Sequence, residues 1–237
     1  MAPDVALDVL EREASAFAEL LVESALEAPV AGCPGWSLLD LAHHLGGVHR
    51  WARHVVVDGP SQAPVDGVPD DPAAVAPWFR EGAADLVETL RGISPDRPCW
   101  TLAPPSTVRF WLRRQAHETT IHCWDAATAV GIDVQLDDAL ALDGLDEVAT
   151  VFLPRQVRLG RLAPTENGIE LVAASGASTL LTSDPRGGAT SPVATITGSA
   201  GPLLLLAWKR LPLSDPRFLV TGDADAAQRL LDGAITP

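Results

Sequence analysis

The sequence predicts two domains, an N-terminal four-helix bundle over residues 1–134 and a smaller C-terminal α+β domain over residues 135–237. Three observations support this prediction. Helical periodicity recurs in four long segments of the first half. Short strand-like segments separated by turn residues occur only in the second half. The chain has 237 residues, 47% of them hydrophobic, which suffices for two modest cores.

Each helix of the predicted bundle has its own signal. In the first, residues 4–28, Leu7 and Phe17 belong to one apolar stripe. Ser37 is a candidate N-cap of the second helix, and Gly131 is placed to end the fourth. The second, third and fourth helices are expected at 37–57, 73–91 and 106–130.

Two long connections join these helices. Residues 58–72 are rich in Pro, Gly and Asp and indicate a surface loop, and residues 92–105 form a second loop. Long helices joined in this way are typical of a four-helix bundle.

The second half has a different pattern. Residues 136–156 predict a connecting helix, and two further helices are expected at 202–211 and 223–234. Between and around them lie short segments with turn residues on both sides, which predict strands. These strands are expected at 168–175, 177–183, 193–199 and 217–222.

Composition excludes several classes of function. The formal net charge of −14 disfavours nucleic acid and anionic membrane surfaces as partners. The N-terminus lacks the basic region of a signal peptide, and the longest apolar run, residues 202–208, is too short to span a bilayer. Three widely spaced cysteines indicate neither a disulfide framework nor a zinc ribbon, so we expect a reduced, cytoplasmic protein. We also expect the protein to be monomeric or homodimeric. Absent Tyr and a single Lys suggest a protein from a high-GC bacterium.

Three of the six histidines lie in CPGWSLLDLAHHLGGVHRW, residues 33–51. On an ideal helix His44 and His49 flank opposite edges of the apolar stripe, whereas His43 points roughly the other way. We therefore expect His43 to face solvent or an interface. Helical geometry leaves His44 and His49 both open as inward-facing residues.

The fourth helix contains a matching pair. Glu118 and His122 are four residues apart and share a face, whereas His117 diverges from His122, so the segment is not an HExxH metalloprotease motif. With one inward histidine of the second helix, the pair makes a two-His-one-carboxylate set. Such a set is typical of catalytic zinc and also suits ferrous iron, nickel or manganese. A buried Glu–His hydrogen bond without a metal is the alternative.

Three neighbouring residues have weaker signals. Asp125 follows His122 by nearly one turn and could orient its imidazole, although a solvated helix residue is the commoner case. Cys123 is expected in the core, and Cys33, just before a Pro-Gly turn, as a small turn residue.

Three motifs together resemble the mycothiol-dependent maleylpyruvate isomerase family. They are CPGWSLLDLAHHLGGVHRWA (33–52), RRQAHETTIHCWDA (113–126) and GPLLLLAWKRLP (201–212). The resemblance covers about residues 5–233 and implies that the first domain is a DinB-like metal-binding bundle.

That resemblance also implies a ligand set. The family's zinc ligands fall on His44, Glu118 and His122, which selects His44 over His49 and leaves His49 as a helix-flank residue. The family also uses an arginine of the C-terminal domain, for which Arg210 is the candidate. Its alternative role is that of an ordinary exposed arginine.

The leading functional hypothesis is therefore a zinc-dependent enzyme with a low-molecular-weight thiol, mycothiol, as cosubstrate. The thiolate would add to an activated alkene and isomerise a maleylpyruvate-like substrate from cis to trans. Without elimination the same site would act as a mycothiol S-transferase on an electrophilic metabolite. A non-catalytic metal-binding module and a metal-dependent hydrolase are competing hypotheses for the same residues.

Overall fold

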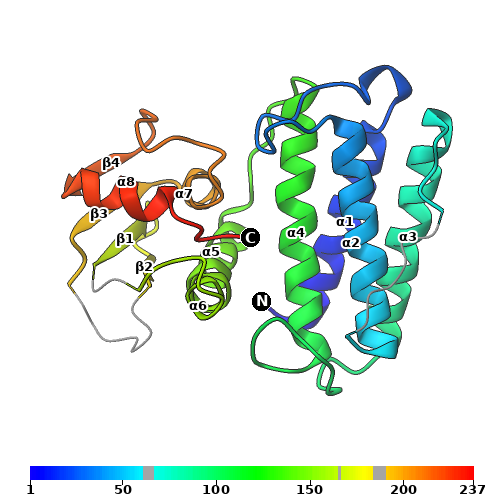
Figure 1. The fold of residues 1–237 in the computed structure, drawn as a ribbon, viewed down its shortest axis with the longest axis horizontal. Coiled ribbons are helices and arrows are strands. Elements are labelled where there is room, and N and C mark those ends of the chain that lie inside the picture. Colours follow the sequence, from blue (N-terminus) through cyan, green and yellow to red (C-terminus); the bar gives the residue numbers. More distant parts are fainter. Residues whose placement is uncertain (61–66, 165–166, 184–190) are drawn as a thin grey trace. The chain divides into compact units, whose positions relative to one another are not determined.

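Four long helices build the first of two compact units, residues 1–134 (Figure 1). The computed structural model describes residues 1–60, 67–164, 167–183 and 191–237. The helices are α1 (Pro3–Leu20), α2 (Leu38–Asp58), α3 (Pro72–Gly92) and α4 (Val108–Ala129). Helix α1 packs against α3 and α4, and α2 packs against the same two helices, so α2 and α4 are neighbours.

Helix α1 is shorter than its periodicity predicts. It ends at Leu20 instead of near residue 28, and a short 3-10 turn, η1 (Glu23–Ala25), follows. The reason is tertiary: the backbone carbonyls of Leu26 and Ala28 accept hydrogen bonds from the first residues of α2. That pairing is incompatible with a continuing helix.

A capping box fixes the start of α2. The Ser37 hydroxyl accepts a hydrogen bond from the backbone N–H of Asp40, and the Asp40 carboxylate accepts one from the backbone N–H of Ser37 at 2.8 Å. These bonds hold the pKa of Asp40 below its usual value. The predicted N-cap is confirmed, and with it the register that places the histidines of α2.

Close packing with α3 orients α2 about its own axis. A Cβ at Gly46 would collide with the indole of Trp78 on α3, so only glycine permits this approach. Arg50, one turn later, places its guanidinium 4.1 Å from the centre of the Trp78 ring and donates a hydrogen bond to the Trp78 carbonyl. The opposite side of α2 consequently faces α4.

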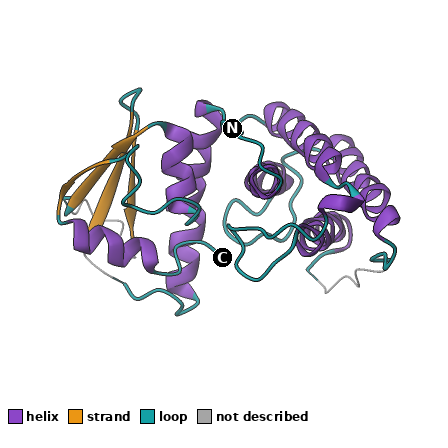
Figure 2. Ribbon diagram, turned by 90° about the horizontal axis from the view of Figure 1, so that it is seen from above, coloured by secondary structure: helices purple, strands orange, loops and turns teal. Residues whose placement is uncertain are grey.

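The second unit, residues 135–237, contains one mixed sheet and several helices (Figure 2). Strand order is β2-β1-β3-β4, in which β1 runs antiparallel to β2 and parallel to β3, and β4 runs antiparallel to β3. The elements are α5 (Asp138–Glu147), η2 (Val148–Phe152), α6 (Leu153–Arg158), β1 (Gly168–Ala173), β2 (Ser178–Thr182), β3 (Ala194–Gly198), α7 (Ala200–Ala207), β4 (Leu219–Gly222) and α8 (Ala224–Asp232).

The connecting helix predicted at 136–156 contains a wider turn. Because Pro154 has no N–H, the α-helical hydrogen-bond pattern fails at this point, and η2 is a π-helical turn in which the Leu153 N–H bonds the Val148 carbonyl. The sheet buries one face, with Ile169, Leu171 and Ile196 at 1% exposure or less. Both α7 and α8 contact β1 and β3.

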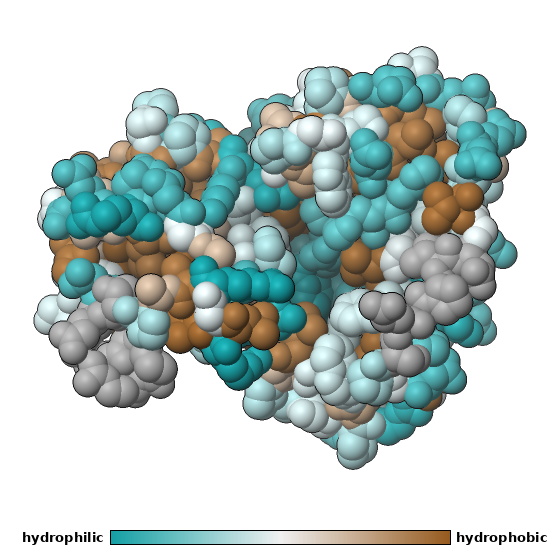
Figure 3. Space-filling model, in the orientation of Figure 1, coloured by the Kyte–Doolittle hydropathy of each residue, from teal (hydrophilic) through white to brown (hydrophobic). Residues whose placement is uncertain are grey.

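The predicted fold class, a helical N-terminal region with a smaller C-terminal α+β part, is confirmed. Residues 61–66, in the middle of the loop expected at 58–72, lie outside the described residues. On the visible face of each unit, hydrophilic and hydrophobic side chains are interspersed (Figure 3). None of the helices within the described ranges has both the length and the apolar character that crossing a bilayer requires.

Candidate metal centre

Three side chains from α2 and α4 converge inside the first unit. Oε1 of Glu118 lies 3.3 Å from Nε2 of His44 and 3.3 Å from Nε2 of His122. One ligand atom from each of the three residues lies within 4.8 Å of the others. Two imidazole nitrogens and one carboxylate oxygen therefore point toward a common space.

Arg114 fixes the remaining oxygen of Glu118. It lies one turn earlier on α4, is buried, and forms an ion pair with Oε2. Burial alone would raise the pKa of Glu118, but the charges of Arg114 and His122 hold it well below its usual value. The carboxylate is thus ionised, with Oε1 directed at the histidines. Sequence reasoning missed Arg114, although its spacing of four residues from Glu118 was an available signal.

Asp125 orients His122 from the other side. Its Oδ2 lies 3.1 Å from Nδ1 of His122, and its side chain is fully buried. Burial disfavours the charged imidazole, but the charge of Glu118 and the hydrogen bond to Asp125 raise the pKa of His122 well above its usual value. Because an ionised carboxylate only accepts, Asp125 keeps a proton on Nδ1, and Nε2 is the nitrogen directed at the convergence point.

His44 leaves one side of the group accessible. Its side chain is 34% exposed, whereas His122 is 8% exposed. The Trp36 ring lies 5.0 Å from the His44 ring, and the two histidine rings are 5.1 Å apart. The donor group is therefore partly exposed on the His44 side, where Trp36 also lies.

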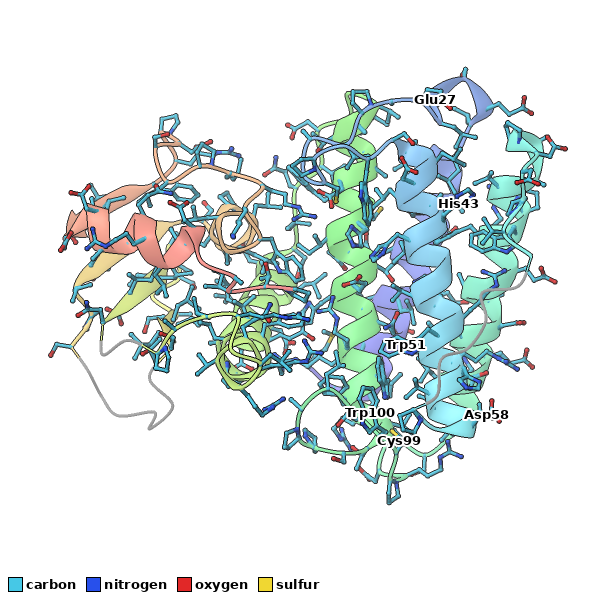
Figure 4. The ribbon with its side chains drawn as sticks, viewed as in Figure 1. Glu27, His43, Trp51, Asp58, Cys99 and Trp100 are labelled. Atoms are coloured by element: carbon cyan, nitrogen blue, oxygen red, sulfur yellow. The ribbon has the colours of Figure 1, made fainter. Side chains whose placement is uncertain are left out.

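The other two histidines of α2 have different surroundings. His43 packs edge-on against Trp78, 5.9 Å between ring centres, and its Nε2 is buried without a hydrogen-bond partner (Figure 4). It therefore belongs to the packing between α2 and α3, where it is half-buried. His49 is fully buried, with Nε2 2.9 Å from the Thr119 hydroxyl. The expectation of a helix-flank residue is wrong for His49, which is a core residue.

Cys33, which was expected to be a small turn residue, lies close to this centre. Its Sγ lies 3.8 Å from Oδ2 of Asp125, and the sulfur, Asp125 and His122 form a second group of donors within 4.8 Å. Cys123 is buried in the core as predicted, and burial raises the pKa of its thiol to about 12.

Two tryptophans of α2 and the turn before it have different surroundings. Trp36 lies beside His44. Trp51 lies near Trp100 and Trp111, with ring centres 6.2 Å and 5.1 Å away, at the other end of the bundle (Figure 4). Trp51 thus packs within the bundle, whereas Trp36 borders the donor group.

Arg210 belongs to the second unit and follows α7. The preceding Lys209 has a left-handed backbone, φ 60°, which is uncommon for a residue with a side chain. Arg210 is half-buried, and its Nη1 donates a hydrogen bond of 2.8 Å to the Trp208 carbonyl. With Lys209, Gln228 and Asp232 it lines a cavity of about 340 Å³ within this unit.

The donors in the first unit fit a catalytic divalent metal. Two imidazoles and one carboxylate with an accessible side are the protein ligands of several catalytic zinc sites. Arg114 directs a single oxygen of Glu118, and Asp125 orients His122, as partners of metal ligands commonly do. The same contacts also satisfy Glu118 by hydrogen bonds alone, which is the metal-free alternative.

Comparisons with known proteins agree with this division of the chain. The family model described as the mycothiol maleylpyruvate isomerase N-terminal domain matches residues 7–127, and the model of the corresponding C-terminal domain matches residues 139–229. No curated protein matches the chain. Crystal structures of the mycothiol-dependent maleylpyruvate isomerase and of its histidine-to-alanine mutant share the fold. Their TM-scores are 0.67 and 0.66, at 13% identity over 93% of each chain.

Proposed function

The chain belongs to the mycothiol maleylpyruvate isomerase family, and from this membership we propose a metal-dependent enzyme that uses mycothiol as cosubstrate. Its reaction would be the cis–trans isomerisation of an activated alkene related to maleylpyruvate. The observation that carries the proposal is the convergence of His44, Glu118 and His122 on an accessible point. The DinB-like assignment of the first unit is part of this proposal.

The proposed metal ligands are Nε2 of His44, Oε1 of Glu118 and Nε2 of His122, and zinc suits this set best. When bound, the metal would supply a Lewis acid that lowers the pKa of a coordinated thiol, so that a thiolate would be available near neutral pH. Arg114 and Asp125 keep these donors in place. His44 and Trp36 border the side from which the thiol would enter.

The thiolate sulfur would form a bond to one alkene carbon while the π electrons move to the activating carbonyl. The former double bond then rotates as a single bond. Elimination returns the electrons, breaks the carbon–sulfur bond and releases the isomer and the thiol. A cation must stabilise the negative oxygen between these steps, and we propose Arg210 for this role.

An S-transferase on a less acidic electrophile is the second candidate, because without elimination the same site yields a thiol conjugate. The net charge of −14 favours it, since a dicarboxylate is repelled by such a chain. For either activity we propose a reduced cytoplasmic setting, compatible with three cysteines that form no disulfide, and no nucleic acid or membrane partner.

The test combines three measurements on protein purified without a metal-chelating tag: metal content, binding of mycothiol, and turnover of maleylpyruvate with mycothiol. We expect about one zinc per chain and thiol-dependent turnover. Turnover without thiol would indicate metal-dependent hydrolysis instead. Thiol conjugates without isomer would favour the S-transferase, and metal without turnover of a screened electrophile set would leave a non-catalytic module.

A further inference from the structure

The imidazole of His122 lies between two sets of donors. Its Nε2 faces Oε1 of Glu118 at 3.3 Å, together with His44. Its Nδ1 faces Oδ2 of Asp125 at 3.1 Å, where Sγ of Cys33 lies 3.8 Å from the same oxygen. Each side therefore offers one carboxylate oxygen and one further donor atom beside a ring nitrogen.

The two sets differ in chemistry. The first provides a second imidazole, whereas the second provides a thiol. A thiolate is a soft ligand and selects thiophilic metals such as zinc, copper(I) or cadmium, while carboxylate and imidazole are less selective. Cys33 is half-buried, and the side chain of Asp125 is fully buried.

The backbone around Cys33 holds the sulfur in position. The Cys33 N–H donates to the Val30 carbonyl at 3.0 Å, and the Cys33 carbonyl accepts from the Trp36 N–H at 3.0 Å. The capping box at Ser37 follows immediately. Backbone hydrogen bonds therefore hold the turn on both sides of Cys33, and they place its sulfur next to α4.

From this arrangement we propose that Cys33, Asp125 and Nδ1 of His122 form a second metal site, for thiophilic ions, that is an alternative to the site of His44, Glu118 and His122. The two sites exclude each other because a neutral imidazole has one lone pair. An ion at the second site replaces the proton of the Cys33 thiol and the proton on Nδ1. The thiol proton leaves to solvent, and the one proton that the neutral imidazole retains lies on Nε2, which donates it to Glu118.

Cadmium alone is the probe, because a cadmium–thiolate bond has an ultraviolet charge-transfer absorption. In the metal-free full-length His44→Ala variant we expect this absorption to saturate at about one cadmium per chain. Adding Cys33→Ser should remove the band and weaken cadmium binding at least about tenfold. Adding Cys99→Ser or Cys123→Ser should leave both unchanged.

Zinc preloading tests the exclusion between sites. Wild-type protein with about one zinc should show little cadmium–thiolate absorption, because His122 is already engaged. Two metals bound to one chain at the same time would overturn the shared-imidazole arrangement. A band that survives Cys33→Ser, or no band in His44→Ala protein with a native circular dichroism spectrum, would overturn the site itself.

Cys33→Ala is the second variant should Cys33→Ser fail to fold, and the same band is expected to be absent. The outcome is separable from that of the proposed function. Failure of the Cys33 site leaves zinc binding and thiol-dependent turnover of the wild type intact. If the proposed function is wrong, the wild-type protein lacks zinc binding and thiol-dependent turnover, whether or not the variants bind cadmium.

Discussion

Arg114 and Glu118 form a buried ion pair through Oε2 of the carboxylate, which leaves Oε1 to face the histidines. The pair therefore decides which oxygen of Glu118 is offered to a metal. It also supplies the positive charge that keeps a buried carboxylate ionised.

Replacing Arg114 by Gln should weaken both metal binding and folding. Without the guanidinium, Glu118 loses the partner of Oε2, and zinc affinity should fall about 10- to 100-fold. The metal-free protein should lose about 3–5 kcal/mol of unfolding free energy, the usual cost of breaking a buried ion pair. Zinc competition titration and denaturant unfolding measure these effects. Arg109→Gln, which breaks an exposed pair with Asp96, is the control and should cost less than about 1 kcal/mol.

In a Cys33→Ser background, which removes the second donor group, His44→Ala and His122→Ala should each abolish stoichiometric zinc binding, because each removes one of three donors. His43→Ala should retain about one zinc per chain, since its ring packs on Trp78 away from Glu118. Elemental analysis of the three variants checks this. Loss of zinc on His43→Ala, with retention on His44→Ala, would contradict the ligand assignment.

Asp125→Asn should lower zinc affinity about 10- to 100-fold while keeping the fold. The amide oxygen can still accept from Nδ1 of His122, but the negative charge that favours this orientation is gone. Competition with a chelator of known affinity gives the change. Cys33→Ser is the matched control at the same spot and should leave affinity at the His44 site unchanged; equal losses in both variants would refute a specific role for Asp125.

His49 should make stability depend on pH. Burial lowers its folded-state pKa from 6.5 to about 3, so below the unfolded value the unfolded chain binds a proton that the folded chain does not. Stability is thus lost as the pH falls from 6.5 toward 3. Between about pH 7 and about pH 5 this amounts to about 2 kcal/mol.

The comparison is wild type against His49→Gln by denaturant unfolding at both pH values. The variant should be less stable at neutral pH, because His49 fills a core position, yet its loss between the two pH values should be smaller. Parallel pH curves for the two proteins would show that His49 does not cause the dependence.

Arg210→Ala should keep the fold and the zinc content but weaken binding of an anionic substrate by about 1–3 kcal/mol, the range for a hydrogen bond to a charged group. Isothermal titration and steady-state kinetics measure this. Arg217→Ala, which removes an exposed arginine paired with Asp215, serves as the control. Unchanged substrate binding in Arg210→Ala would remove Arg210 from the reaction.

Periodicity and capping predicted much of the fold. Ser37 marked the start of α2, and the strands after residue 168 were located by their turn residues. The end of α1 was missed because backbone pairing with the start of α2, a non-local interaction, ends the helix before its periodic pattern does.

The candidate site was less predictable from helical geometry. A helical-wheel projection of α2 places His44 and His49 at the two edges of the apolar stripe. It does not show which neighbouring helix lies at each edge. In the structure His44 meets Glu118, and His49 meets Thr119, the next residue of α4. Helix α4 is buried along most of its length, so its sequence has no single apolar stripe that marks the inward face. The direction in which Arg114 points could therefore not be predicted from the pattern.

All three proposed ligands, with Arg114 and Asp125, lie in the first unit, which ends at residue 134. This has an evolutionary consequence. A gene fusion or exchange at that boundary would transfer the whole donor set in one piece, because no ligand is left behind in residues 135–237. Descendant proteins could acquire a different second unit, and with it a new substrate preference, while they keep the same metal ligands.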